Sequence, residues 1–298
     1  MTPRVRAEVS LLATTVIWGS TFAVAKLAMT GMSAQSLMIF RFSAASVFFL
    51  VFFWRHIIPI PLAAMKKGTI LGTLLFLGFI AQTIGLNYTT ASKSAFITSM
   101  MVVFTPFLQV LISKKSPTIG NVLGIVVVCG GLWLFTSPEG SSFNLGDGLT
   151  LLCALLFAIY IVYLDVVSKT IPTLQLSFLQ VASCAVLSWG LILPMDGPVL
   201  PASSNSWVAL AYLTIFATFL TTLVQTRFQQ DTTPTRAVII FSVEPLFATL
   251  FASLLLNEVI GSVGLIGGML IVGGILLSEL SDLVPGLRNP VMVRNETR

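Results

Sequence analysis

The feature that most constrains this chain is a series of long apolar segments that occupy most of its length. Ten of them approach the length of about 20 residues that a helix needs to cross a bilayer. Their approximate limits are 9–29, 35–54, 69–88, 93–112, 119–136, 148–167, 174–194, 206–226, 233–256 and 261–280. None alternates like the strands of a β-barrel. The sequence therefore predicts an all-α integral membrane protein with ten transmembrane helices.

The composition agrees with this class. Of the 298 residues, 56% are hydrophobic and 9% are charged, and the mean hydropathy is +0.97. Soluble domains usually carry about 25% charged residues. The net charge of +5 does not indicate a nucleic-acid partner, because the basic residues lie in short loops between apolar segments. The expected partners are the lipid bilayer and a small-molecule substrate.

The distribution of lysine and arginine predicts the orientation in the membrane. Only Lys93 falls on one side, Lys26 and Arg41 fall within spans, and the other basic residues share the opposite side. The residues on that opposite side are Arg4, Arg6, Arg55, Lys66, Lys67, Lys114, Lys115, Lys169, Arg227, Arg236, Arg288, Arg294 and Arg298. Cytoplasmic loops are enriched in these residues. Both termini, including the tail 282–298, are therefore expected in the cytoplasm, with the protein in the plasma (inner) membrane of a prokaryote.

An internal repeat divides the chain into two halves of five spans, residues 9–136 and 147–281. Positions in the two halves correspond at a constant shift in residue number up to the third span, and at a slightly larger shift after it. Equivalent pairs include Glu8 and Asp147, Trp18 and Phe157, Thr90 and Thr233, Lys93 and Arg236, and Gly124 and Gly267. Because each half has an odd number of spans, the second half must be inverted relative to the first, an arrangement typical of secondary transporters.

Two further comparisons of the halves bear on this inversion. Lys115 corresponds to Glu258, so the same loop position is cationic on the expected cytoplasmic face and anionic on the other face. The prolines differ, since Pro106 corresponds to threonine and Pro245 to valine. A proline inside a helix produces a kink. The sequence thus predicts kinks that are offset by about one helical turn between the halves.

From residue 9 to residue 281 the chain resembles the drug/metabolite transporter superfamily, in its EamA-type branch with five plus five spans. The resemblance depends on Trp18–Phe22, Arg41-Phe42, Tyr88–Ser92, Glu244-Pro245 and Asn257-Glu258. It implies a central cavity surrounded by the first, third, fourth, sixth, eighth and ninth spans, which favours Trp18, Tyr88, Tyr160 and Gln225 as cavity residues. The chain departs from the family pattern at Lys115 and at Asn257.

Glu244 is the main candidate for a functional residue. It lies about 11 residues, or roughly 16 Å, into its span, near the bilayer midplane, and Pro245 follows it. An ionisable group in hydrocarbon is costly and commonly marks a transport pathway. Because burial favours the neutral form of a carboxyl group, Glu244 is a candidate for coupling proton movement to substrate movement. The alternative is a permanently neutral acid bonded to the backbone at the kink.

The basic residues within or beside the spans are weaker candidates. Arg41 could bind a substrate carboxylate or phosphate in a bidentate manner, or it could cap carbonyl groups of a neighbouring helix. Lys26 is expected to reach the membrane interface. Lys93 is expected to be exposed in a loop, where a role at an outer gate is a minor alternative.

Several aromatic residues could line an apolar pocket. They are Trp18, Phe22, Phe40, Tyr88, Tyr160 and Tyr163. Residues three or four apart share a helix face, although aromatic residues in membrane helices also form packing stripes and interface belts. Small residues at Gly120/Gly124 and Gly264/Gly268 predict close helix packing in spans five and ten, with a homodimer contact through these spans as the alternative.

The sequence lacks the residue patterns that a metal site or a nucleotide cofactor would need. Cys129, Cys153 and Cys184 lie in apolar spans, His56 is the only histidine, and the sequence has no phosphate-binding P-loop. We expect no enzyme and no cofactor. The favoured function is a secondary transporter that exports or exchanges small metabolites, such as amino acids or amphiphilic compounds. An exchanger of organic anions and a scaffold or sensor without transport are the alternatives.

Overall fold

The computed structural model describes all residues except 1, 115–116, 137–143, 193–196, 258–261 and 282–298. All regular secondary structure in the described ranges is helical. In the first half the helices are α1 (Pro3–Met29), α2 (Ala34–Ile57), α3 (Leu62–Gly85), α4 (Ala91–Ser99), α5 (Met101–Ser113) and α6 (Ile119–Thr136). In the second half they are α7 (Leu145–Ser168), α8 (Thr173–Ile192), α9 (Ser204–Thr214), a π-helix η1 (Ile215–Leu220), α10 (Thr221–Phe228), a 3₁₀ turn η2 (Gln229–Asp231), α11 (Pro234–Phe241), α12 (Glu244–Leu256) and α13 (Ser262–Ser281).

Within the described residues, eight helical segments are long and apolar enough to cross a membrane. They are α1, α2, α3, α4 with α5, α7, α8, α9 through η2, and α11 with α12. The helix α6 adds a shorter apolar stretch, Ile119–Gly131. The prediction of an all-helical membrane protein is confirmed at this level, whereas the ten crossings and the inverted repeat stay predictions.

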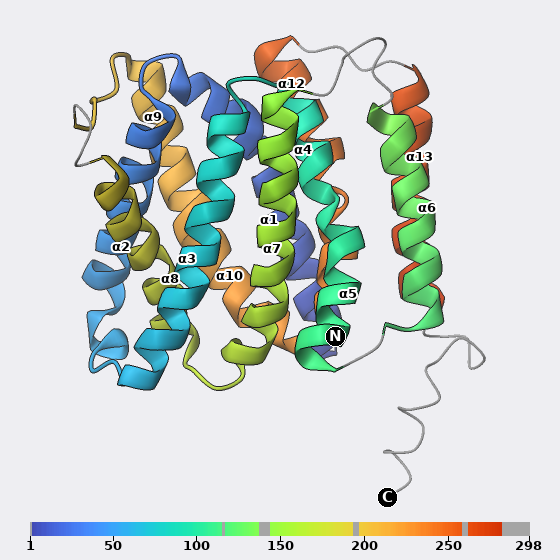
Figure 1. Ribbon diagram of the computed structural model, residues 1–298, viewed down its shortest axis with the longest axis horizontal. Helices are drawn as coiled ribbons and strands as arrows, with labels where there is room; N and C mark the ends of the chain where they lie inside the picture. The colour runs from blue at the N-terminus through green and yellow to red at the C-terminus, as the bar shows by residue number, and fades with distance from the viewer. Residues whose placement is uncertain (1, 115–116, 137–143, 193–196, 258–261, 282–298) are drawn as a thin grey trace, which may run out of the picture.

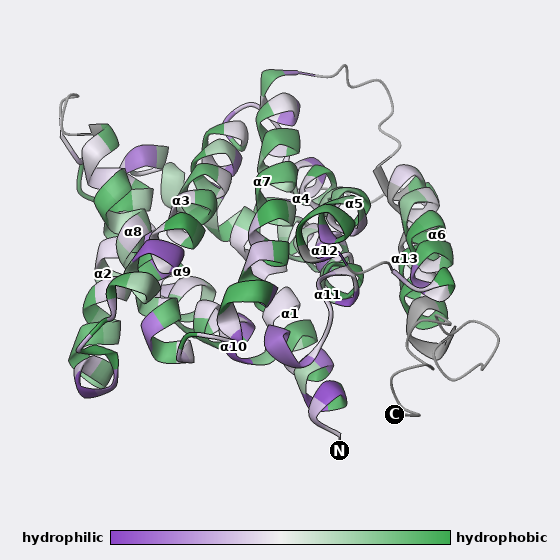
Figure 2. Ribbon diagram, turned by 60° about the horizontal axis from the view of Figure 1, so that its bottom comes forward, coloured by the Kyte–Doolittle hydropathy of each residue, from purple (hydrophilic) through white to green (hydrophobic). Residues whose placement is uncertain are grey.

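The hydropathy of the surface fits a protein surrounded by lipid. Large apolar side chains are exposed along the outer faces of the helices, among them Trp133, Val208 and Leu254. In Figure 2 the green of hydrophobic residues runs along most helices, and hydrophilic residues colour only a few turns, including the first turns of α1. Such a surface is stable in hydrocarbon and would aggregate in water.

Threonine side chains fix where two of the central helices begin. Thr90 caps α4 by accepting a hydrogen bond from the backbone N–H of Lys93, and Thr233 caps α11 by accepting one from Arg236. Such caps satisfy backbone donors that have no partner in the first helical turn. They also place a basic side chain in the first turn of each helix.

Both of these helices are interrupted at corresponding positions. The helix α4 stops before Met100 and α11 stops before Ser242. Met100 and Val243 occupy equivalent positions of the sequence repeat. Each bonds through its N–H to the carbonyl three residues back, and each accepts the N–H three residues ahead. The interruptions therefore have the same hydrogen-bond pattern.

The two interruptions align with each other, and the offset of one turn predicted for the proline kinks stays a prediction. Pro245 is the second residue of α12, directly after the interruption, but Pro106 lies inside α5, six residues after Met100. Pro106 cannot bond to the Val102 carbonyl, which weakens the first turn of α5. The interruption falls just before that turn, and so it aligns with the one in the other half.

The helices α6 and α13 lie side by side at one edge of the molecule (Figure 1). A Cβ atom on Gly131 would lie 2.7 Å from the Gly267 carbonyl oxygen, and one on Gly274 would lie 2.8 Å from the Gly124 carbonyl oxygen. Only glycine permits this crossing. The close packing predicted at Gly124 thus occurs within the chain. The surroundings of Gly264 and Gly268 lie outside the description, and a homodimer contact stays a prediction.

Candidate functional site

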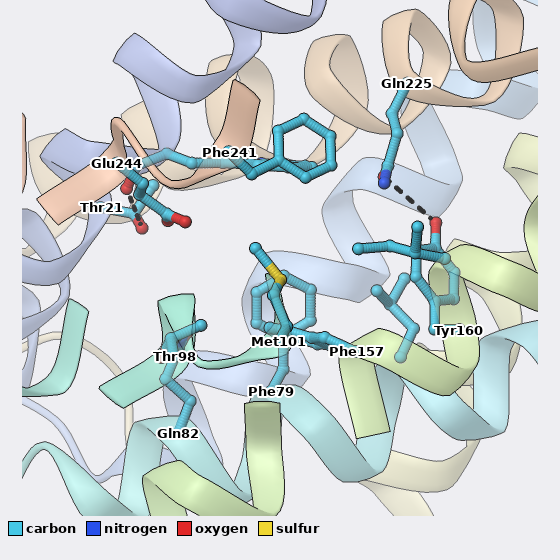
Figure 3. Close-up of a pocket in the computed structure, with 13 residues that line it drawn as sticks. Thr21, Phe79, Gln82, Thr98, Met101, Phe157, Tyr160, Gln225, Phe241 and Glu244 are labelled. Atoms are coloured by element: carbon cyan, nitrogen blue, oxygen red, sulfur yellow. Dashed lines mark hydrogen bonds between the residues drawn. The ribbon is translucent and has the colours of Figure 1, made fainter. Parts of the chain in front are cut away.

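A cavity lies at the centre of the bundle, at the level of the two helix interruptions (Figure 3). Its walls come from α1, α3, α4, α5, α7, α10, α11 and α12. The lining residues are Trp18, Thr21, Leu75, Phe79, Gln82, Thr98, Met101, Phe157, Tyr160, Ile161, Gln225, Phe241 and Glu244. Its volume is about 50 Å³, on a measure in which one water needs roughly 10–15 Å³. In this conformation it has room for a few water molecules.

Glu244 is the charged residue of this lining. It is the first residue of α12, directly after the interruption, and it is 5% exposed. Among the described residues, no hydrogen bond or ion pair reaches its carboxyl group. Figure 3 shows the carboxyl group beside Thr21, with Phe241 extending along the same wall. The carboxyl group is therefore placed to exchange a proton or bind a polar group in the cavity.

The helix interruption and the close approach of α1 together place the Glu244 carboxyl group at the cavity. Val243 accepts the N–H of Leu246, and Pro245 supplies no N–H of its own. On the other side, a Cβ atom on Gly19 of α1 would lie 3.0 Å from the Glu244 carbonyl oxygen and 2.5 Å from Phe247 Cβ. The absence of a side chain at Gly19 lets α1 approach α12 closely, which brings Trp18 and Thr21 to the carboxyl group.

A hydrogen-bond network forms the wall opposite Glu244. The Tyr160 hydroxyl donates to Gln180 Oε1 at 2.6 Å and also hydrogen-bonds the Gln225 amide group at 3.3 Å (Figure 3). Gln225 in turn donates to Gln229, and Gln229 donates to the Ile161 carbonyl oxygen. This buried network ties α7, α8 and α10 together, and it holds the Tyr160 ring at the cavity surface.

A third polar position is the pair Gln82 and Thr98, where the Gln82 amide nitrogen donates to the Thr98 hydroxyl at 3.1 Å. The remaining lining is mostly aromatic and aliphatic. Five aromatic rings face the cavity, and none of the described lining residues is positively charged. Aromatic faces attract cations, and the lining places such faces around one carboxyl group.

The structure brings four of the seven predicted cavity residues together. Trp18, Tyr160, Gln225 and Glu244 all line the cavity. Phe22, one turn beyond Trp18, is fully buried in a separate apolar cluster. Tyr88 is 56% exposed after the end of α3. Phe40 and Tyr163 also lie outside the lining.

Arg41 also lies outside the cavity, and it contacts a neighbouring helix. Its Nε donates to the Thr218 hydroxyl, and its Nη2 donates to the Ala217 carbonyl oxygen at 3.1 Å. Both acceptors belong to the π-helix η1, where the i→i−5 pattern displaces backbone carbonyls. The guanidinium carbon is also 4.7 Å from the centre of the Phe79 ring. The alternative role, capping carbonyls of a neighbouring helix, is the one seen.

We expect Arg41→Met to lower stability while leaving ligand binding intact. The variant loses both hydrogen bonds from the guanidinium group to η1, and a hydrogen bond to a charged group is worth about 1.5–3 kcal/mol. The measurement is the melting temperature of the purified protein, with and without a bound ligand. An unchanged melting temperature together with a lost ligand-induced shift would instead place Arg41 at the substrate.

Two other basic residues were considered in the sequence, Lys26 and Lys93, and one of them lies elsewhere than predicted. Lys26 is half-buried on α1. Lys93 is not in an exposed loop: it lies in the first turn of α4, and its ammonium group is 2.7 Å from Asp147 Oδ2. The cap formed by Thr90 starts the helix earlier than the apolar pattern indicated. The residues Lys115 and Glu258 lie outside the described ranges.

The sequence missed most of the lining, although a signal for it exists. In five helical segments the lining residues come three apart, which is the spacing that puts two side chains on one helix face. The pairs are Trp18 and Thr21, Phe79 and Gln82, Thr98 and Met101, Phe157 and Tyr160, and Phe241 and Glu244. Four of these pairs join an aromatic ring to a polar side chain.

The described residues contain no cluster of three or more His, Cys, Asp or Glu side chains able to hold a metal ion. The cysteines Cys129, Cys153 and Cys184 are unpaired thiols. The polar groups of the cavity are one carboxyl, one phenol, and amides and hydroxyls. This set is suited to reversible binding.

Comparisons with known proteins identify the family and the fold. A family model described as the EamA-like transporter family matches residues 5–137 and again residues 144–280. A protein of Archaeoglobus fulgidus named an uncharacterized transporter is 32% identical over 93% of this chain and 87% of the relative. A second such protein from the same organism is 23% identical over 92% of this chain and 97% of the relative. A solved crystal structure of 16% identity has a TM-score of 0.76, covering 96% of this chain and all of that one, and so shares the fold.

Proposed function

The chain belongs to the EamA-like transporter family and is a multi-pass membrane transporter; from this premise we propose that it is a secondary active transporter that exports or exchanges small metabolites. In this proposal the substrate binds in the central cavity, and Glu244 couples its movement to that of a proton. The observation that carries the proposal is the Glu244 carboxyl group, buried at a helix interruption and facing an aromatic cavity.

Many secondary transporters that work by alternating access are built from two structural repeats, and we propose two inverted repeats of five spans here, 9–136 and 147–281. The equivalent interruptions at Met100 and Val243 support this. So do the left-handed backbone conformations at Lys114 and Asn257, which are again equivalent positions of the sequence repeat. In this arrangement α6 and α13 are the fifth and tenth crossings, and both termini lie in the cytoplasm of a prokaryotic cell.

The charge of the cavity favours one class of substrate. A carrier of organic anions or phosphorylated metabolites needs positive charge at the binding site, and the described lining has none. An ammonium group would be attracted by the Glu244 carboxylate and by the aromatic faces of Trp18 and Phe241. We therefore propose amino acids or cationic amphiphilic compounds as substrates.

The experiment is a thermal-shift screen of the purified protein, followed by transport in liposomes. Ligands that bind the folded state raise the melting temperature by mass action. We expect shifts from amines and amino acids with apolar side chains, and none from sugar phosphates or nucleotides. Selective stabilisation by phosphorylated compounds would contradict the proposed substrate class. Failure of every stabilising ligand to exchange across a proteoliposome membrane would contradict transport of these compounds.

A further inference from the structure

Two ion pairs connect the halves of the protein near opposite ends of the bundle. Near the N-terminal end of α1, Glu8 Oε1 is 2.7 Å from an Nη1 atom of Arg236 in the first turn of α11. Near the start of α7, Asp147 Oδ2 is 2.7 Å from Lys93 Nζ in the first turn of α4. Each pair thus joins the first helix of one half to the fourth span of the other half.

The two pairs occupy corresponding positions in the repeat. Glu8 corresponds to Asp147, and Lys93 corresponds to Arg236. Because α1 begins at the end of the molecule where the N-terminus lies and successive spans run antiparallel, the pairs are at opposite ends (Figure 1). The cavity lies between them on the same helices: α1 contributes Trp18 and α7 contributes Phe157. Each is ten residues beyond its carboxylate, which is about 15 Å along the helix.

Both pairs are largely shielded from solvent. The side chains of Glu8 and Arg236 are 16% and 5% exposed, and those of Asp147 and Lys93 are 0% and 18% exposed. Ion pairs at exposed positions contribute little, but charges at these positions interact strongly and are costly to separate. Each pair therefore holds two cavity-lining helices together at one end of the cavity.

From this geometry we propose that the Glu8–Arg236 and Lys93–Asp147 ion pairs are the two gates of the transport pathway, which open alternately. This inference rests on the alternating-access transport proposed above. Both pairs are formed here, and the cavity has room for a few water molecules only. Breaking the Glu8–Arg236 pair lets α1 and α11 separate on the N-terminal side. Breaking the Lys93–Asp147 pair lets α4 and α7 separate on the opposite side.

The carboxylates have additional structural roles that decide which partner to vary. Asp147 also accepts hydrogen bonds from the Thr89 hydroxyl and from the backbone N–H of Asn144, as part of the cap of α7. Glu8 also pairs with Arg4 at 2.9 Å. The first variants are therefore Arg236→Gln and Lys93→Gln, which leave the carboxylates in place.

The experiment measures access to the cavity from each side of the membrane. The three native cysteines are replaced by alanine, and Thr21→Cys introduces one thiol into the cavity lining. A membrane-impermeant charged maleimide is then applied to right-side-out and to inside-out vesicles. We expect Arg236→Gln to raise the labelling rate from the side of the N-terminus by at least about fivefold and to lower it from the other side. Lys93→Gln should do the reverse.

Two further sets of variants make the result decisive. The neutral doubles Glu8→Gln/Arg236→Gln and Lys93→Gln/Asp147→Asn avoid an unpaired buried charge and should shift labelling in the same directions. The matched control is Lys169→Gln, which breaks an ion pair of 2.7 Å between the residue that follows α7 and the buried Asp165 near the end of that helix, with no second helix involved. It should leave the labelling from both sides unchanged.

Three results would overturn the proposal. They are equal changes in labelling from both sides, no change in either gate variant, and neutral doubles that do not fold, which would indicate a purely structural role. The labelling needs no substrate and no pH gradient. Side-specific labelling with normal pH-driven transport by a Glu244 variant would therefore contradict the coupling role alone. Coupled transport without side-specific labelling would contradict the gates alone.

Discussion

Glu244→Gln is expected to reduce transport driven by a pH gradient by at least about tenfold, which corresponds to about 1.4 kcal/mol in the barrier. Glutamine has nearly the shape of protonated glutamate, but it can neither release a proton nor become charged. The cavity then stays in one charge state, and the proton gradient cannot act on it. The measurement is uptake of an identified substrate into proteoliposomes with and without an imposed pH gradient.

The same variant is expected to fold as well as the parent protein. The Glu244 carboxyl group makes no hydrogen bond to the described residues, and a neutral amide costs less than an ionised acid at this depth. Exchange of substrate without a gradient should persist, with a raised KM because the variant lacks the carboxylate that attracts an ammonium group. The matched control is Asp165→Asn, which removes another buried carboxyl group on a cavity helix, outside the lining. Normal gradient-driven uptake by the Gln variant would show that Glu244 is not the coupling group.

Gly19→Ala is expected to lower stability by about 1–3 kcal/mol and to abolish most transport. The added methyl group would lie 2.5 Å from Phe247 Cβ and 3.0 Å from the backbone nitrogen of Ala248. The backbone of α12 cannot yield as a flexible side chain would, so α1 must move away. Trp18 and Thr21 would then lose their position beside Glu244. The measurements are the thermal unfolding of the purified variant and its substrate exchange in liposomes.

Gly130→Ala provides the control for this prediction. A Cβ atom on Gly130 of α6 meets no atom within 4 Å. Alanine is favoured over glycine inside a helix by roughly 0.5–1 kcal/mol, so this variant should be as stable as the parent protein or slightly more stable. If Gly19→Ala matched Gly130→Ala in both stability and exchange, the close approach of α1 to α12 would not be what positions the cavity.

The sequence was sufficient for the class of the protein and for its central residue. Many apolar segments of bilayer-spanning length indicate a membrane protein, and in a bilayer the backbone of a span must satisfy its own hydrogen bonds as a helix. An acid followed by a proline at mid-span contradicts both requirements locally, and so Glu244 could be identified without coordinates. The resemblance carried by Trp18 and Glu244 pointed to the family that the comparisons show.

The sequence was less informative about which side chains share the cavity. Trp18 and Phe22 are four residues apart on α1, yet only Trp18 lines the cavity, because Phe22 packs into a separate cluster. Which part of an apolar helix face meets a cavity and which part meets another helix depends on crossing positions. Such positions are set by contacts such as Gly19 against α12, between residues far apart in the chain.

The neighbouring sequence also did not predict the partners of the charged residues. Arg41 stands within an apolar span and Lys93 at the polar start of one, and each could have been exposed or bound to substrate. The partners that decide their roles are Asp147, 54 positions further along the chain, and Ala217, 176 positions further along. A charge in a membrane protein is placed by the partner that compensates its burial, and that partner is known only from the tertiary structure.

By itself, then, the sequence determined the membrane environment, the helical spans and the buried acid, because each follows from the cost of placing polar groups in hydrocarbon. The tertiary structure alone decided that the helix interruptions align, that Arg41 supports the π-helix, and that two equivalent ion pairs lie above and below the cavity. These features depend on how distant helices cross, and no local property of the chain specifies a crossing.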